Sequence, residues 1–242
     1  MKKSLITFFG VLACLGALSV PASAEWFADL FVGPAFTQSE DVVYKTNNTT
    51  AVGLIRDKDV DFKNVVSFGG RAGYWFESTP YIGLAMDVSH FRPDIGDQFV
   101  TRCLLGACFG GTPLAQIDLA VTGISFDVLL RLPLLTSKEF PKGQLQPYLT
   151  IGPTIFISSI DINEPGFTPS KHSDTDTSVG VKAGAGLAWQ FHRNVALFTE
   201  YRFTHFAPEF GIQEEFLGKT RVNSDLNTHH VIFGVSFRLP TP

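Results

Sequence analysis

The stretch 195-VALFTEYRFTHF-206 decides the fold. Apolar and aromatic residues surround Glu200 and Arg202, which are two positions apart, the side-chain period of a β-strand. In a soluble sheet, the polar face of such a strand meets water and the apolar face meets a core. The apolar set here, which includes Tyr201 and Phe203, is too continuous and too aromatic for that arrangement. We therefore expect Glu200 and Arg202 to point into a polar interior, and Tyr201 and Phe203 to face a membrane.

Residues 1–24 have the features of a secretory signal peptide. Two lysines open the chain, an apolar run covers 6–20, and 22-ASA-24 matches an A-x-A cleavage site. The run is short for a membrane-spanning helix. We predict that the signal peptide is removed and that residues 25–242 form one outer-membrane β-barrel domain. A lipoprotein anchored at Cys14 is the alternative, because 11-VLAC-14 partly matches a lipobox.

Composition narrows the class of protein. Removal of residues 1–24 would take away two lysines and no acid, which moves the formal net charge from −4 to −6. The sequence has no basic patch of the kind that binds nucleic acid. Phenylalanine is abundant, with 23 residues, and after residue 24 no continuous apolar stretch reaches the roughly 20 residues of a spanning helix. An exported chain of this kind is either a soluble β-protein or an outer-membrane barrel.

The period-two pattern, punctuated by Gly, Pro, Asn and Asp, predicts eight strands. They cover about 26–37, 60–76, 80–92, 115–132, 145–160, 178–191, 195–207 and 227–239.

The connections between these strands alternate in length. Those at 77–79, 133–144 and 192–194 are short or modest, whereas those at 38–59, 93–114, 161–177 and 208–226 are long and polar. Short periplasmic turns with long external loops are typical of outer-membrane barrels. The sequence therefore predicts an all-β fold: an eight-stranded antiparallel up-and-down transmembrane β-barrel in the bacterial outer membrane, with both ends on the periplasmic side.

The two faces of the predicted strands differ in chemistry. One face is apolar and the other carries small residues and isolated charges, which cannot form a hydrophobic core but can fill a polar lumen. A soluble barrel would expose an apolar belt too large for a soluble monomer. One segment is out of phase: Ile117, Leu119 and Val121 are apolar where polar residues are expected. We expect either a bulge at Gly123 or a segment that stands above the membrane.

The lumen face carries charges that nearly balance. The predicted network consists of Asp29, Asp87, Asp127 and Glu200 with Arg71, Arg131, Lys182 and Arg202. An eight-stranded barrel is just wide enough for side chains to fill it. Unpaired charges there would lose their hydration, so we expect ion pairs that plug the barrel. An ion path through the lumen is the alternative.

Aromatic residues cluster near both ends of the predicted strands, where we expect them to form interfacial girdles. The periplasmic set is Trp26, Tyr74, Trp75, Phe76, Tyr81, Tyr148 and Trp189, and the external set is Phe91, Phe206 and Phe210.

Few residues suggest chemistry. Cys103 and Cys108 lie in one external loop of an exported protein, so we predict a disulfide. His205, His229 and His230 come together at the predicted outer rim, where a metal or lipopolysaccharide phosphates are possible ligands. The ligand set is thin for a metal, and no nucleophile elbow or phosphate-binding loop occurs. We predict no catalytic residue, no metal and no cofactor.

The segments 147-PYLTIGPTIF-156, 184-GAGLAWQFHRNVALFTEYRF-203 and 230-HVIFGVSFRL-239 resemble the OmpA/OmpX-type small outer-membrane barrels. The resemblance covers most of residues 25–242 and implies contact with outer-membrane lipid and lipopolysaccharide, and insertion by the barrel-assembly machinery. It specifies fold better than function.

Three functions remain open. The first is a non-enzymatic envelope protein whose four loops contact a surface ligand. The second is a narrow channel or a transporter of small hydrophobic molecules. The third is a lipid A-modifying enzyme, because His205 could match the histidine of barrel deacylases, although Ala207 stands where their serine nucleophile would be.

Overall fold

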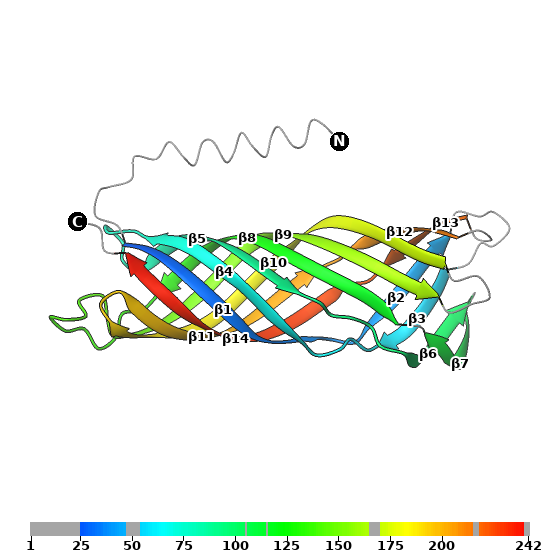
Figure 1. The fold of residues 1–242 in the computed structure, drawn as a ribbon, viewed down its shortest axis with the longest axis horizontal. Helices are drawn as coiled ribbons and strands as arrows, with labels where there is room; N and C mark the ends of the chain where they lie inside the picture. The colour runs from blue at the N-terminus through cyan, green and yellow to red at the C-terminus, as the bar shows by residue number, and fades with distance from the viewer. Residues whose placement is uncertain are drawn as a thin grey trace, which may run out of the picture.

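Eight strands close into a barrel in the computed structural model, which describes residues 25–46, 54–104, 106–114, 116–164, 170–214 and 218–239 (Figure 1). The barrel strands are β1 (Glu25–Thr37), β4 (Val65–Trp75), β5 (Ile82–Phe91), β8 (Ile117–Arg131), β9 (Leu145–Glu164), β10 (Ser170–His192), β11 (Val195–Phe206) and β14 (Leu226–Leu239). The predicted all-β, eight-stranded antiparallel barrel is therefore confirmed.

Closure comes from β1, which pairs with β4 on one side and with β14 on the other. Trp26 lies opposite Tyr74 and also opposite Leu239, so the first and last barrel strands meet at the same end of the molecule. We call this the turn end, because the connections 76–81, 132–144 and 193–194 lie there, and the opposite end the loop end. In the described part of the chain, no helix is long and apolar enough to span a membrane.

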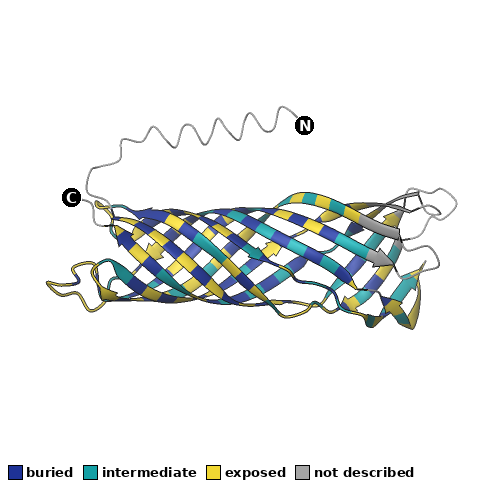
Figure 2. Ribbon diagram, viewed as in Figure 1, coloured by how far each residue is buried: buried dark blue, intermediate teal, exposed yellow. Residues whose placement is uncertain are grey.

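Alternation of side chains gives the barrel an apolar outside. Buried and exposed residues alternate along the barrel strands (Figure 2). Leu30 is 64% exposed on the outer face, whereas Arg202 is 1% exposed on the inner face. The outer face is an apolar belt of the kind that contacts lipid. Its exposed members include Val32, Val66, Leu84, Val128, Ile151, Val181, Tyr201 and Phe237.

The loop end carries a second sheet. Its order is β12 (Glu209–Glu214), β13 (Gly218–Asn223), β2 (Glu40–Thr46), β3 (Leu54–Val60), β6 (Gln98–Leu104) and β7 (Ala107–Leu114). The connections 38–59, 93–114 and 208–226, predicted as polar loops, thus hold strands. In the connection 161–177, residues 161–164 lengthen β9 and residues 170–177 lengthen β10. The predicted strand over 60–76 was too long, because β3 ends at Val60 and β4 starts at Val65.

Of the two explanations predicted for Ile117, Leu119 and Val121, the bulge at Gly123 is wrong, and the segment that stands above the membrane stays a prediction. Strand β8 keeps a single register against β5 and against β9 on both sides of Gly123, so no bulge occurs there. The three apolar side chains point inward and are at most 6% exposed. Their phase is that of Asp127 on the same strand. What changes along β8 is the chemistry of the interior, which is polar near the turn end and apolar near the loop end.

Several aromatic residues predicted for the girdles lie inside the barrel instead. Trp75 and Tyr148 are buried at the turn end, and Phe91, Phe206 and Phe210 are buried at the loop end. The first four residues share the inward phase of their barrel strands. Phe210, on β12, belongs to the same apolar core as Phe91 and Phe206. Trp26, Tyr81 and Trp189 are exposed near the turn end, as a girdle requires.

Glycines on neighbouring strands make room for the inward aromatic rings. A Cβ at Gly73 would lie 2.4 Å from a ring carbon of Phe27, and one at Gly234 would lie 2.4 Å from a ring carbon of Phe198. Each such ring lies directly across the ladder from its glycine, so a narrow lumen can hold both the rings and the charges. The pairs are Phe27 with Gly73, Phe31 with Gly69, Trp75 with Gly83, Tyr148 with Gly186 and Phe198 with Gly234.

Candidate functional site

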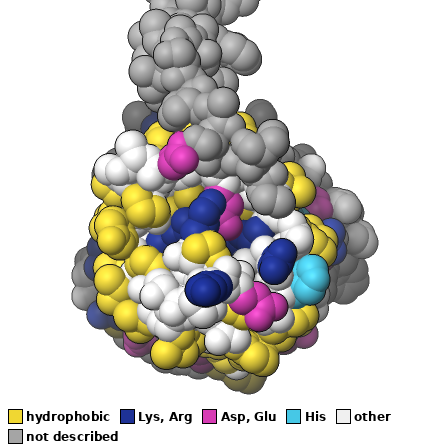
Figure 3. All heavy atoms as spheres, turned by 90° about the vertical axis from the view of Figure 1, so that its left-hand side faces the viewer, with side chains coloured by type: hydrophobic (Ala, Val, Ile, Leu, Met, Phe, Trp, Pro, Cys, Tyr) yellow, Lys and Arg dark blue, Asp and Glu magenta, His cyan; other side chains and the backbone are white. Residues whose placement is uncertain are grey.

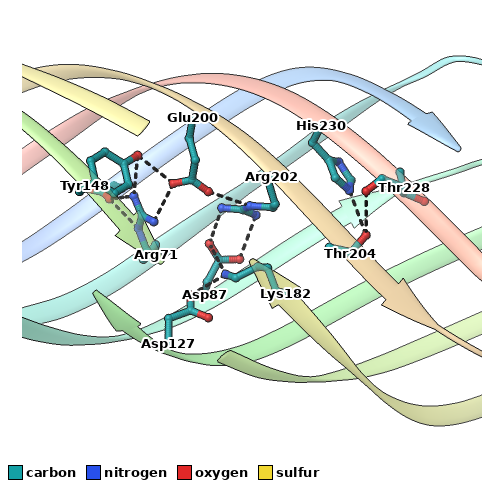
Figure 4. Close-up of polar contacts among 11 residues, drawn as sticks. Arg71, Asp87, Asp127, Tyr148, Lys182, Glu200, Arg202, Thr204, Thr228 and His230 are labelled. Atoms are coloured by element: carbon teal, nitrogen blue, oxygen red, sulfur yellow. Dashed lines mark hydrogen bonds and ion pairs between the residues drawn. The ribbon is translucent and has the colours of Figure 1, made fainter. Parts of the chain in front are cut away.

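A chain of ion pairs crosses the middle of the barrel interior (Figure 4). Glu200, from β11, accepts from Arg71 on β4 through Oε2 at 2.9 Å and from Arg202 through Oε1 at 2.9 Å. Each carboxylate oxygen therefore has its own guanidinium, an arrangement that compensates the loss of hydration of these buried charges.

The chain continues toward the opposite wall. Arg202 donates from Nη2 to Asp87 Oδ2 at 2.8 Å, and Asp87 also lies 3.2 Å from Lys182 Nζ. Lys182 reaches Asp127 Oδ2 at 2.5 Å. On the other side, Arg71 contacts Asp29 Oδ2 at 2.8 Å. The seven residues, from β1, β4, β5, β8, β10 and β11, tie six of the eight barrel strands together.

Arg131, the eighth charge of the predicted network, belongs to a separate cluster at the turn end. Its Nη2 lies 2.9 Å from Glu25 Oε2, which also lies 3.5 Å from Lys142 Nζ. Arg131 Nε donates to the backbone oxygen of Pro80. Glu25 and Arg238, which are both buried at this end, were not predicted as members of the charge network. Both have the inward phase of their strands, so the parity that identified Asp29 on β1 could also have found Glu25.

Aromatic rings cover the luminal arginines. The guanidinium of Arg131 lies 4.1 Å from the ring centre of Trp75, and that of Arg202 lies 4.6 Å from the ring centre of Phe31. Tyr148 donates from its hydroxyl to Glu200 Oε2 at 2.8 Å. Rings and ion pairs together hold the cations in fixed positions and exclude water from them.

Toward the loop end the interior becomes apolar. Beyond Arg202, a short polar layer contains Thr204, Thr228 and His230, whose Nε2 lies 3.3 Å from Thr204 Oγ1 (Figure 4). Above it, the rings of Phe156 and Phe206 stack with centres 4.0 Å apart. The apolar core extends into the second sheet and comprises Val42, Val60, Phe91, Ile95, Val100, Leu114, Ile117, Leu119, Val121, Phe156, Ile160, Phe206, Phe210, Val222 and Leu226.

The three histidines of the predicted outer rim do not converge on one point. His230 is buried inside the barrel, whereas His229 lies on the outer face with Nδ1 2.6 Å from the hydroxyl of Tyr201. His205, also on the outer face, lies 2.8 Å from Asn227 Oδ1. Within the described ranges, no three His, Cys, Asp or Glu residues are grouped so that they could hold a metal ion.

Cys103 and Cys108 face each other across the hairpin of β6 and β7. Their sulfur atoms lie 2.06 Å apart, at the distance of the predicted disulfide. The bond therefore belongs to the second sheet and lies outside the barrel ladder.

Comparison with known proteins gives the class. The family model described as outer membrane protein beta-barrel domain matches residues 10–238, so the chain belongs to this family. It is therefore a bacterial outer-membrane protein in contact with lipid and lipopolysaccharide. Among curated protein sequences, none matches.

Solved structures share the fold at low sequence identity. The outer membrane protein OprG from Pseudomonas aeruginosa is 12% identical, with a TM-score of 0.56, over 90% of this chain and 97% of that one. Neisserial surface protein A is 14% identical, with a TM-score of 0.49, over 89% and 97%. The outer membrane protease OmpT from Escherichia coli is 8% identical, with a TM-score of 0.43, over 89% and 97%. These likenesses concern the fold alone.

Proposed function

We propose that this protein is a non-enzymatic envelope protein: a closed barrel that holds a β-sheet outside the membrane for contact with a surface ligand. The network of Asp29, Arg71, Asp87, Asp127, Lys182, Glu200 and Arg202 carries this proposal. Its side chains are at most 3% exposed, so the lumen that they cross offers no continuous path for water or ions.

The apolar core is a second barrier in the lumen and also supports a closed barrel. Ions that passed the charged network would meet the stacked rings of Phe156 and Phe206, which cannot replace a hydration shell. An ion would have to cross a charged barrier and then an apolar barrier. Two such barriers in series are expected of a closed, rigid scaffold and not of a conducting pore.

The second sheet supports a role in surface contact. Strands β2, β3, β6, β7, β12 and β13 form a continuous ladder at the loop end, which faces the outside of the cell. The ion pair of Arg102 and Asp57 joins β6 to β3 at 2.6 Å, and the disulfide closes β6 on β7. Function often resides in connections on a rigid scaffold, and here much of the described part of the connections forms strands.

Conductance in a planar bilayer tests the proposal. We expect the purified, refolded protein to insert, as judged by heat-modifiable migration, and to stay electrically silent. Steady openings that change in a Glu200→Ala variant would contradict the closed-barrel proposal and favour a channel. Insertion by the barrel-assembly machinery is part of the proposal, and depletion of that machinery is expected to lower the amount of folded protein.

Transport of small hydrophobic molecules is a second candidate. It is supported by the contact between β12 and β10, beside the apolar core, where side chains replace the backbone ladder. Strand β12 meets β10 through side chains: the backbone N–H groups of Glu209 and Gly211 donate to carboxylates of Asp176 and Asp174, at 3.2 and 2.6 Å. Faster uptake of an apolar fluorescent dye by cells with an Asp174→Ala/Asp176→Ala variant would favour this candidate. Unchanged uptake relative to cells without the protein would exclude it.

Modification of lipid A finds no support in the site. His205 contacts Asn227 on the outer face, and Ala207 offers no nucleophile. We therefore do not propose this activity.

A further inference from the structure

A small cavity lies at the turn end of the barrel interior. Basic side chains occupy the centre of this end when it is viewed from the periplasm (Figure 3). The cavity measures about 20 Å³, enough for one water molecule or a monatomic ion. Its lining includes Asp29, Trp75, Arg131, Gln146, Ser236 and Arg238.

Hydrogen-bond donors without protein partners surround this cavity. Among the described residues, nothing accepts a hydrogen bond from Nε or Nη1 of Arg238 or from the indole Nε1 of Trp75, and Ser236 Oγ also has no partner. Arg238 is only 6% exposed, and Trp75 only 4%. Buried donors are nearly always satisfied in folded proteins, so these groups point to a ligand that accepts several hydrogen bonds.

The charges at this end are also unequal. Glu25 forms ion pairs with Arg131 and Lys142, and its carboxylate also attracts Arg238, which itself forms no ion pair with any carboxylate of the described residues. Three cations therefore share one carboxylate at the mouth. Asp29 Oδ1 also lacks a hydrogen-bond partner, but the other oxygen of Asp29 is bound to Arg71.

We propose that the periplasmic mouth of the barrel binds a small monovalent anion of the size of chloride. Arg238 and Trp75 donate to it, and Ser236 can add a third donor. The anion compensates the unpaired guanidinium, whose burial is otherwise unfavourable. The free oxygen of Asp29 favours a water molecule at the same place, so the experiment must distinguish the two ligands.

A nuclear magnetic resonance titration makes that distinction. The chain has three tryptophans, and Trp26 and Trp189 are half exposed on the outer face, so a Trp75→Phe variant assigns the indole signal of Trp75. Chloride replaces gluconate at constant ionic strength in the refolded protein. We expect the Trp75 signal to shift and to saturate, as binding at one site requires.

Two variants make the titration specific. Arg238→Met removes a cation that forms no ion pair with a described carboxylate and keeps a side chain that can pack on Phe27, so folding, checked by heat-modifiable migration, is expected to survive. Apparent affinity should fall by about tenfold or more, the effect of losing one charge-assisted hydrogen bond. Arg193→Met, at the exposed turn between β10 and β11, is the matched control and should leave the affinity unchanged.

The proposal is overturned if the wild-type signal does not saturate with chloride, which would mean that water fills the cavity. An equal response in Arg238→Met and Arg193→Met would overturn it as well. If Arg238→Met does not fold, Arg238→Lys keeps the charge but replaces the planar guanidinium, whose Nε and Nη1 both donate, by a single nitrogen. An unchanged affinity in that variant would contradict the role of the Arg238 guanidinium.

Discussion

The two halves of the barrel interior occupy the same phase of the same strands and yet differ in chemistry. On β11, Glu200 and Arg202 lie in the charged half, and Phe206 lies in the apolar half. On β8, Asp127 lies in the charged half and Val121 in the apolar half. The phase of a residue in its strand therefore decides whether its side chain points inward. Its position along the strand decides whether it lies among charged or among apolar side chains.

The halves should respond differently to substitution. The charged half holds groups that lost their hydration and depend on each other, so removal of one partner leaves an uncompensated charge. The apolar half depends on volume, so its losses should scale with the cavity that a substitution leaves. Four predictions test this contrast, from the largest expected effect to the smallest.

Glu200→Ala should destabilise the barrel most, by about 3–5 kcal/mol, because Arg71 and Arg202 both lose a buried partner. Denaturant unfolding in lipid vesicles, followed by tryptophan fluorescence, measures the change. The charge-neutral control, Glu200→Ala/Arg202→Ala, leaves the pairs of Arg71 with Asp29 and of Lys182 with Asp127 in place. It should recover part of the loss, and a double variant no more stable than Glu200→Ala would argue against coupling.

Leu119→Ala in the apolar half should cost roughly 2–3 kcal/mol through the cavity it creates. The same unfolding experiment measures it. Leu130→Ala on the outer face of the same strand is the matched control, and it should cost less, because Leu130 packs against lipid or detergent that can adapt. Equal losses would mean that the apolar half is not packed as a core.

Gly234→Ala should cost about 1–2 kcal/mol, because the new methyl group would overlap both the ring of Phe198 and the backbone oxygen of Leu30. Gly70→Ala is the control, since its Cβ would meet nothing closer than 3.3 Å. Thermal midpoints of heat-modifiable migration compare the two variants. A neutral Gly234→Ala would show that the inward rings can move.

Removal of the disulfide should change barrel stability by less than about 0.5 kcal/mol, because the hairpin of β6 and β7 belongs to the second sheet. Hydrogen exchange in a Cys103→Ser/Cys108→Ser variant should rise in this hairpin only. Faster exchange in β8 or β9 would mean that the second sheet and the barrel unfold together.

Local periodicity was sufficient to predict the barrel and its inward charges. The phase of Glu200 and Arg202 extends without interruption to Phe206, so the position of Phe206 was also available from the sequence. Aromatic residues generally prefer membrane interfaces, so Trp75, Tyr148, Phe91 and Phe206 were predicted to lie in the outer girdles. Their side chains point into the barrel instead. For Trp75 and Tyr148, the position of each aromatic residue opposite a glycine is the signal that could have corrected the prediction.

Pairings between distant segments were beyond the sequence. Tyr44 pairs with Val222 in the second sheet, and no local pattern links two residues so far apart. The partners within the charged network are also set by three-dimensional distance. Parity gave eight inward charges and also applies to Glu25 and Arg238, but only the structure separates Arg131 from the other seven and groups it with Glu25 at the mouth.

Conductance of opened barrels tests the central claim, that two barriers in series close the lumen. The measurement compares the wild type with Glu200→Ala/Arg202→Ala, with Phe156→Ala/Phe206→Ala and with all four substitutions combined, each shown to be inserted. We predict silence for the first three and steady openings only for the combined variant. Openings in the wild type, or full conductance after either pair of substitutions alone, would contradict the claim.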